Sequence, residues 1–67
     1  MNLYDYLKSQ EISKQDYPFY ALIMAAMRQA DTHNLELLQE AFPEVWAQFI
    51  ARYNAPGGRL ENEQEEV

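Results

Sequence analysis

The sequence predicts an all-α protein: a compact bundle of three to four short helices with a disordered acidic C-terminal tail. The longest clean helical pattern covers residues 34–54, and a second apolar stripe covers residues 17–30. Sixty-seven residues allow one domain. We place this domain at residues 1–54 and treat residues 55–67, which begin with the APGG hinge, as a flexible acidic tail.

A short first helix is predicted from Leu3 to Gln10. Asn2 suits the N-cap position, and Asp5 lies in the first turn, where a negative charge favours the helix. Leu3 and Leu7 are one turn apart and are expected to face inward. Because a helix of this length is unstable alone, we expect it to dock on the rest of the chain.

The second helix is predicted to run from Tyr17 or Pro18 to Ala30. Pro18 fits a helix start, since its missing N–H costs nothing there. Ser13 and Asp16 precede it at the spacing of a capping box, with Asp in place of the usual Glu or Gln. Asp16 is the alternative cap.

The third helix is predicted from about Asn34 to Ala41, with Thr32 and Asn34 as competing N-caps. Pro43 disfavours helical geometry at Phe42. This leaves either a corner at Phe42 followed by a separate fourth helix, Pro43–Tyr53, or one kinked helix, and we favour the corner. Asn54 is expected to take the left-handed position after the last helix.

The predicted core consists of large apolar residues from the last three helices. Its members are Leu22, Ile23, Met27, Leu35, Leu38, Phe42, Trp46, Phe49 and Ile50. A single core in so small a domain rarely supplies more than about 3–5 kcal/mol of stability. There is no cysteine, so a disulfide cannot supplement this core, and good helix packing or self-association must do so.

The net charge of −6 is unevenly placed. Residues 1–58 hold seven acidic and four basic residues, and residues 59–67 hold four acidic and one basic residue, so each part contributes −3. A negative protein repels phosphate, which argues against direct nucleic-acid binding and against anionic membranes. No segment is long and apolar enough to span a membrane, and the N-terminus lacks the pattern of a signal peptide. We therefore expect a cytoplasmic protein.

No catalytic, cofactor-binding or metal-binding motif is present, so we expect no enzyme and no cofactor. His33 is the single histidine and is interpreted as a solvated turn residue. Glu36, Glu40 and Glu44 recur every four residues, which fits a solvated helix face better than a cation site. Both glycines follow a helix, so there is no glycine-rich loop for phosphate.

Nine aromatic residues in so short a chain exceed what a small helical core buries completely. Tyr is enriched at protein interfaces. The aromatic residues of the N-terminal third either cover the core or form an exposed patch for a protein partner or a second copy of the chain. The candidate partner surface is Tyr4, Tyr6, Tyr17, Tyr20 and Met24.

The run FPEVWAQFIARYNAPGG, with DTHNLELLQEA before it, resembles the ending of short uncharacterised proteins of bacterial phages, plasmids and integrated elements. The resemblance covers residues 31–58 and includes no catalytic motif. It implies a small accessory protein of a mobile element.

Two functions follow as hypotheses. The first is a non-enzymatic protein-interaction module, with a homodimer as one form. The second is an acidic inhibitor that mimics nucleic acid and blocks a nucleic-acid-binding protein. The second predicts two rows of acidic side chains on a rigid surface.

Overall fold

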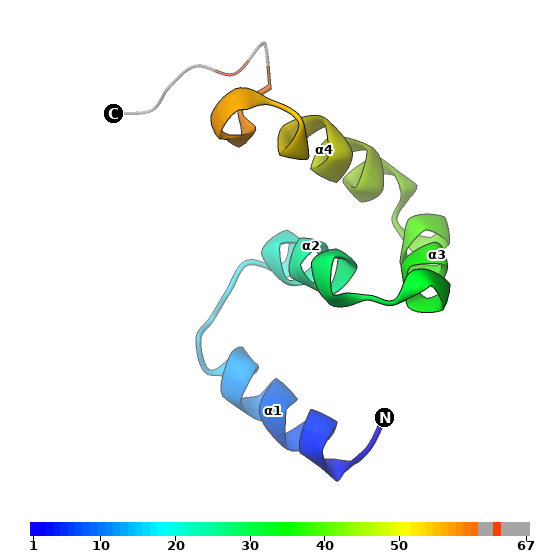
Figure 1. Ribbon diagram of the computed structural model, residues 1–67. Helices are drawn as coiled ribbons and strands as arrows, with labels where there is room; N and C mark the ends of the chain where they lie inside the picture. The colour runs from blue at the N-terminus through cyan, green and yellow to red at the C-terminus, as the bar shows by residue number, and fades with distance from the viewer. Residues whose placement is uncertain (61–62, 64–67) are drawn as a thin grey trace.

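Figure 1 shows the computed structural model, which describes residues 1–60 and Glu63. Within residues 1–60 the chain forms four α-helices, one 3-10 turn and no strand. The elements are α1 (Leu3–Ser13), α2 (Phe19–Gln29), α3 (Thr32–Ala41), α4 (Pro43–Tyr53) and η1 (Pro56–Gly58). The predicted all-α class and four helices are confirmed. Most of the predicted acidic tail, residues 61–62 and 64–67, lies outside the described residues.

The start of α1 agrees with prediction and its end does not. The Asn2 side chain accepts a hydrogen bond from the Asp5 amide at 2.9 Å, and the Asp5 carboxylate accepts one from the Asn2 amide at 3.3 Å. The helix continues to Ser13, one turn past Gln10, because nothing after Gln10 breaks it. The predicted capping box of Ser13 and Asp16 is therefore wrong: Asp16 sits in the connector with a φ of 56°.

The N-terminal ends of α2 and α3 differ from two further predictions. Pro18 is the N-cap of α2, which begins at Phe19. The cap of α3 is neither Thr32 nor Asn34. Asp31 takes this position, and its carboxylate accepts a hydrogen bond from the Asn34 amide at 2.9 Å. Asp caps a helix as well as Asn does, so the helix starts at the earlier residue.

A corner separates α3 from α4, as predicted. Phe42 leaves helical geometry with φ −132° and ψ 62°, and Pro43 is the first residue of α4. The Phe42 carbonyl still accepts a hydrogen bond from the Trp46 amide at 3.0 Å. At the other end, Asn54 keeps a right-handed φ of −91°, so the predicted left-handed position is wrong there. Gly57 and Gly58 take left-handed φ values of 62° and 71° instead.

The helix α4 is the centre of the packing, because α2, α3 and η1 all approach it closely. The helix α1 makes no comparable contact and lies apart from the other three (Figure 1). The radius of gyration is 14.1 Å, against about 11 Å expected for a compact chain of this length. The predicted docking of α1 is wrong, since Leu3 and Leu7 remain 70% and 48% exposed.

The core is smaller than predicted. Met27 and Phe49 are the two buried apolar side chains of the described residues, at 3% and 7% exposure. Five other predicted members are half-buried: Ile23, Leu35, Leu38, Phe42 and Trp46. Leu22 and Ile50 are exposed, so their assignment to the core is wrong. Each helix meets too few neighbours to cover the full width of its apolar face.

Candidate functional site

Among the described residues, most of the exposed large apolar side chains lie near the N-terminal end. Thirteen large hydrophobic residues are exposed, and ten of them lie within residues 1–22. We call these ten the N-terminal apolar surface: Met1, Leu3, Tyr4, Tyr6, Leu7, Ile12, Tyr17, Phe19, Tyr20 and Leu22. An exposed apolar area concentrated in one region indicates a contact site more strongly than scattered single residues do.

The interactions that stabilise α1 are local and lie within the helix itself. Besides its N-terminal capping box, the Ser9 hydroxyl donates to the Tyr6 carbonyl at 2.6 Å. Lys8 Nζ lies 3.4 Å from the Glu11 carboxylate and 5.6 Å from the centre of the Tyr4 ring. Such exposed contacts each contribute only a few tenths of a kcal/mol. An isolated helix of eleven residues is marginal in water, so α1 needs a contact to be fully formed.

A broad hollow of about 580 Å³ lies between the end of α1 and one side of α2. It is lined by Ile12, Tyr17, Ala21, Leu22, Ala25, Ala26 and Gln29. None of these side chains carries a charge, and most are apolar. Because the hollow is open to solvent, its apolar lining is available to another protein surface.

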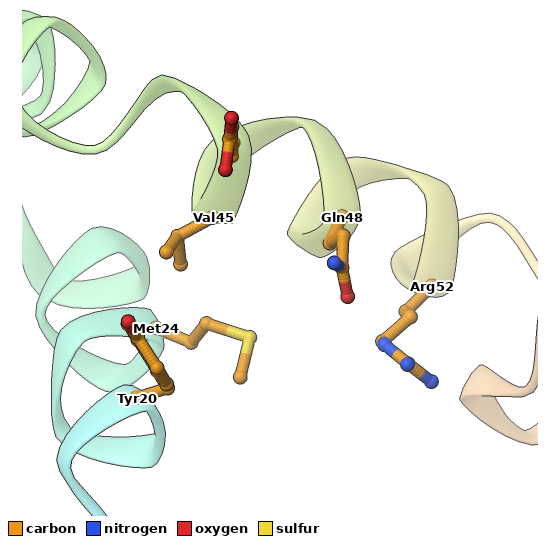
Figure 2. A pocket seen from close by; sticks show the side chains of 6 residues that line it. Tyr20, Met24, Val45, Gln48 and Arg52 are labelled. Atoms are coloured by element: carbon orange, nitrogen blue, oxygen red, sulfur yellow. The ribbon is translucent and has the colours of Figure 1, made fainter.

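A second, narrower groove separates α2 from α4. Figure 2 shows Tyr20 and Met24 on α2 facing Val45, Gln48 and Arg52 on α4. This part of the groove encloses about 250 Å³. It is more polar than the hollow beside α1, because the charged side chains of Glu44 and Arg52 line it together with the Gln48 amide.

The far end of this groove is bounded by cationic and aromatic groups. The Arg28 guanidinium carbon lies 4.8 Å from the centre of the Phe49 ring, a cation–π arrangement. Phe49 also contacts Trp46 and Tyr53, with ring centres 5.7 and 6.1 Å apart. Together these contacts fix the single buried aromatic ring of the described core.

Arg52 on α4 binds the segment that follows this helix. Its Nη1 donates to the Gly58 carbonyl at 2.9 Å and to Glu63 Oε1 at 2.7 Å, and its Nη2 donates to Glu63 Oε2 at 2.5 Å. Glu63 Oε1 also accepts from the Leu60 amide at 3.1 Å. The predicted flexible hinge is thus the ordered turn η1 packed on α4. The sequence gives no spacing rule for this pairing, which depends on the two glycines reversing the chain.

The Arg52–Glu63 pair predicts a distinct titration. The hydrogen bonds from Arg52, followed by the one from the Leu60 amide, lower the pKa of Glu63 from 4.5 to about 2. A lowered folded-state pKa means that the contact stabilises the fold above pH 4.5 and is lost as the pH falls to about 2. In a carboxylate NMR titration, we expect Glu63 to titrate near 2.

The matched control for this titration is the variant Arg52→Gln, in which the pKa of Glu63 should rise toward its ordinary value and be held below it only by the hydrogen bond from the Leu60 amide. A wild-type Glu63 that titrates with the other glutamates would show that the carboxylate does not pair with Arg52 in solution.

The structure does not place the five predicted partner-surface residues on one face. Tyr4 and Tyr6 lie on α1, Tyr17 lines the hollow beside α1, and Tyr20 and Met24 line the groove toward α4. The four tyrosines are exposed, whereas Met24 is half-buried. Sequence reasoning missed the hollow because it placed Ile12 and Ala25, which line it, neither in the core nor on the candidate partner surface. The signal was the scarcity of charge in α2, whose eleven residues include one charged side chain, Arg28.

The other sequence candidates form no chemical centre in the described residues. His33 is exposed in the first turn of α3 instead of in a preceding turn. Across residues 1–60 and Glu63, no three His, Asp or Glu side chains converge as metal ligands. Glu36 and Glu40 lie on α3, but Glu44 lies on α4, so the three acids do not share one helix. No helix within the described part combines the length and apolarity that crossing a membrane requires.

Comparison of the chain with protein-family models, with curated proteins and with solved structures finds no match.

Proposed function

We propose that this chain is a non-enzymatic protein-interaction module that binds through its N-terminal apolar surface. The observation that carries the proposal is the distribution of burial. Ten large hydrophobic side chains are exposed within residues 1–22, whereas the described core buries only Met27 and Phe49. Apolar area that is exposed in one region gains free energy when another protein covers it.

The nature of the exposed side chains supports the same proposal. Tyr4, Tyr6, Tyr17 and Tyr20 combine a large apolar ring with a hydroxyl that tolerates both water and a protein interface. The helix α1 presents two of them on an element with no comparable contact to the rest of the fold. A marginal helix of this kind is stabilised when a partner covers it.

The cellular setting is part of the proposal and has separate support. The likeness of residues 31–58 to short proteins of phages, plasmids and integrated elements supports an accessory role on a mobile element. The absence of cysteine fits a reducing compartment, which supports action in the cytoplasm.

An acidic inhibitor that mimics nucleic acid has less support. Such a mimic needs continuous rows of carboxylates on a rigid surface, and the corner at Phe42 divides Glu36 and Glu40 from Glu44. Arg52 also pairs with Glu63, which removes one acidic group from the available charge.

Affinity capture from an extract of the source cell tests the interaction function. The bait is the wild-type chain, and the test variant carries Tyr4→Ser and Tyr6→Ser, which remove two exposed rings from α1. The matched control is Leu37→Ser, because Leu37 is also a large apolar side chain, 50% exposed, but lies on α3. We expect the wild type and the control to retain the same protein and the test variant to lose it.

Retention of the same proteins by all three baits would argue that the α1 tyrosines do not bind a partner. A wild-type chain that retains no protein and is monomeric in solution would overturn the interaction function as a whole.

A further inference from the structure

Two of the chain's five basic residues line the far end of the groove between α2 and α4. The cavity there has a volume of about 310 Å³, and its lining includes Arg28 on α2 and Arg52 on α4, together with Met24, Phe49 and Tyr53. We call this cavity the arginine end of the groove; Figure 2 shows Arg52 extending from α4 beside it. None of its lining residues is acidic, although the chain has a net charge of −6.

The contact between Arg52 and Glu63 shows which chemical group this end of the groove accepts. The two Nη atoms of Arg52 donate to the two carboxylate oxygens of Glu63, at 2.7 and 2.5 Å. This paired geometry matches the planar guanidinium to a carboxylate. The side chains of Arg52 and Glu63 are 32% and 39% exposed, and an exposed ion pair contributes little to stability. Another carboxylate can therefore reach Arg52 and replace Glu63.

Arg28 supplies a second cation, which no described acid neutralises. Its guanidinium carbon lies 4.8 Å from the centre of the Phe49 ring. A guanidinium over a ring uses its face for this contact and keeps its in-plane N–H donors for an acceptor. Across residues 1–60 and Glu63, no acidic side chain forms an ion pair with Arg28. One guanidinium of the site thus binds a carboxylate already, and the other is open to one.

We propose that the arginine end of the groove binds an acidic peptide segment of another protein, whose carboxylates pair with Arg28 and Arg52. Glu63 occupies Arg52 in the free chain and is the intramolecular competitor that such a peptide displaces. None of the residues of the N-terminal apolar surface lines this cavity, so the site is a contact beyond the proposed function.

Charge complementarity selects this occupant. Two guanidinium groups in a lining without acids attract glutamate or aspartate side chains. A chain of net charge −6 repels a long polyanion such as nucleic acid more strongly than it repels a short peptide with few charges. Met24 and Tyr53 provide apolar contact for the peptide residues beside the carboxylates.

The first test compares two peptides on the wild-type chain. The probe is the acetylated octapeptide LENEQEEV, which has the sequence of residues 60–67 and includes the equivalent of Glu63. Its control is LQNQQQQV, in which glutamine replaces all four glutamates. Each is titrated at low salt into the full, isotope-labelled chain, and the NMR shifts of the backbone amides give the site and the dissociation constant. We expect the acidic peptide to shift amides around Arg28 and Arg52, and the control peptide to shift none.

The second test uses variants of the chain with the acidic peptide. Glu63→Gln removes the competitor and should bind about fivefold more tightly than the wild type. Arg28→Gln removes the open cation and should bind about fivefold more weakly. The matched control is Lys14→Gln, because Lys14 is an exposed cation after α1 that lines none of the hollows described. Its affinity should equal that of the wild type.

Equal binding of the two peptides would overturn the site, and this comparison stays decisive if a variant of the chain unfolds. Affinity that both Glu63→Gln and Arg28→Gln leave unchanged would also overturn it. Inorganic phosphate that shifts the same amides at a lower concentration than the peptide would identify a phosphate site instead.

Ultracentrifugation distinguishes a partner's peptide from the same segment of a second copy. A wild-type dimer that Glu63→Gln dissociates would assign the site to the second copy and overturn a separate partner. The variant with Tyr4→Ser and Tyr6→Ser should bind the acidic peptide as the wild type does, so the failure of this site and the failure of the interaction function are distinguishable.

Discussion

Replacing Phe49 with alanine should lower the free energy of unfolding by about 3 kcal/mol, because Phe→Ala changes at buried positions cost about 3–5 kcal/mol. Phe49 is 7% exposed, and its ring contacts Trp46, Tyr53 and the Arg28 guanidinium. A loss of this size approaches the whole stability that a core of this size supplies. Urea titration followed by circular dichroism measures it, and the neighbouring Trp46 gives an independent fluorescence signal.

Trp46→Ala is the comparison for this experiment. Trp46 is half-buried, so its replacement should cost about half as much as that of Phe49, despite the larger ring. The opposite order, with Trp46 the more costly loss, would show that the centre of the core is misplaced by one turn of α4.

Met27→Ala should give the second large loss, about 2–3 kcal/mol. Met27 is the most buried apolar side chain of the described residues, at 3% exposure, and it is the main contribution of α2 to the core. Removing it leaves a cavity between α2 and α4, which are joined by few other buried groups. Thermal unfolding of the variant and the wild type at equal protein concentration measures the difference.

Met24 on the same helix provides the matched control. It is half-buried in the groove toward α4, so Met24→Ala should cost less than about 1 kcal/mol. Equal losses at Met24 and Met27 would show that the two side chains are covered to the same extent, in conflict with the structure.

Local signals in the sequence predicted the helices well. Asn2 and Pro43 mark the starts of α1 and α4 through a cap and a fixed φ angle, and both act within a few residues. The corner at Phe42 follows from the clash between Pro43 and a helical residue before it. Asp31 was missed because Thr32 and Asn34 are equally good caps on propensity alone.

Packing was predicted less well, because it depends on contacts between distant residues. The apolar pattern of α2 does not specify how many neighbours the helix has, so Leu22 was assigned to a core that does not reach it. Likewise, Leu3 and Leu7 gave α1 an inward face, but among the described elements none packs closely against that face. Both errors involve apolar groups that the described part of the chain leaves exposed.

The sequence predicted which kinds of residue form the candidate partner surface, but it did not predict how these residues are arranged. The tyrosine-rich N-terminal third is exposed, yet its members divide between α1, the hollow beside α1 and the groove toward α4. The Arg52–Glu63 pair was beyond sequence reasoning, since it joins residues eleven positions apart through the turn at Gly57–Gly58. It also anchors Glu63, which had been assigned to a free tail.

The most direct test of the N-terminal apolar surface is amide hydrogen exchange in α1, measured for the chain alone and for the chain bound to the protein that it captures. Because α1 has no close contact with the other helices, its amides should exchange much faster than those of α4 in the free chain and should become protected in the complex. Exchange in α1 that the captured protein leaves unchanged would contradict binding through this surface.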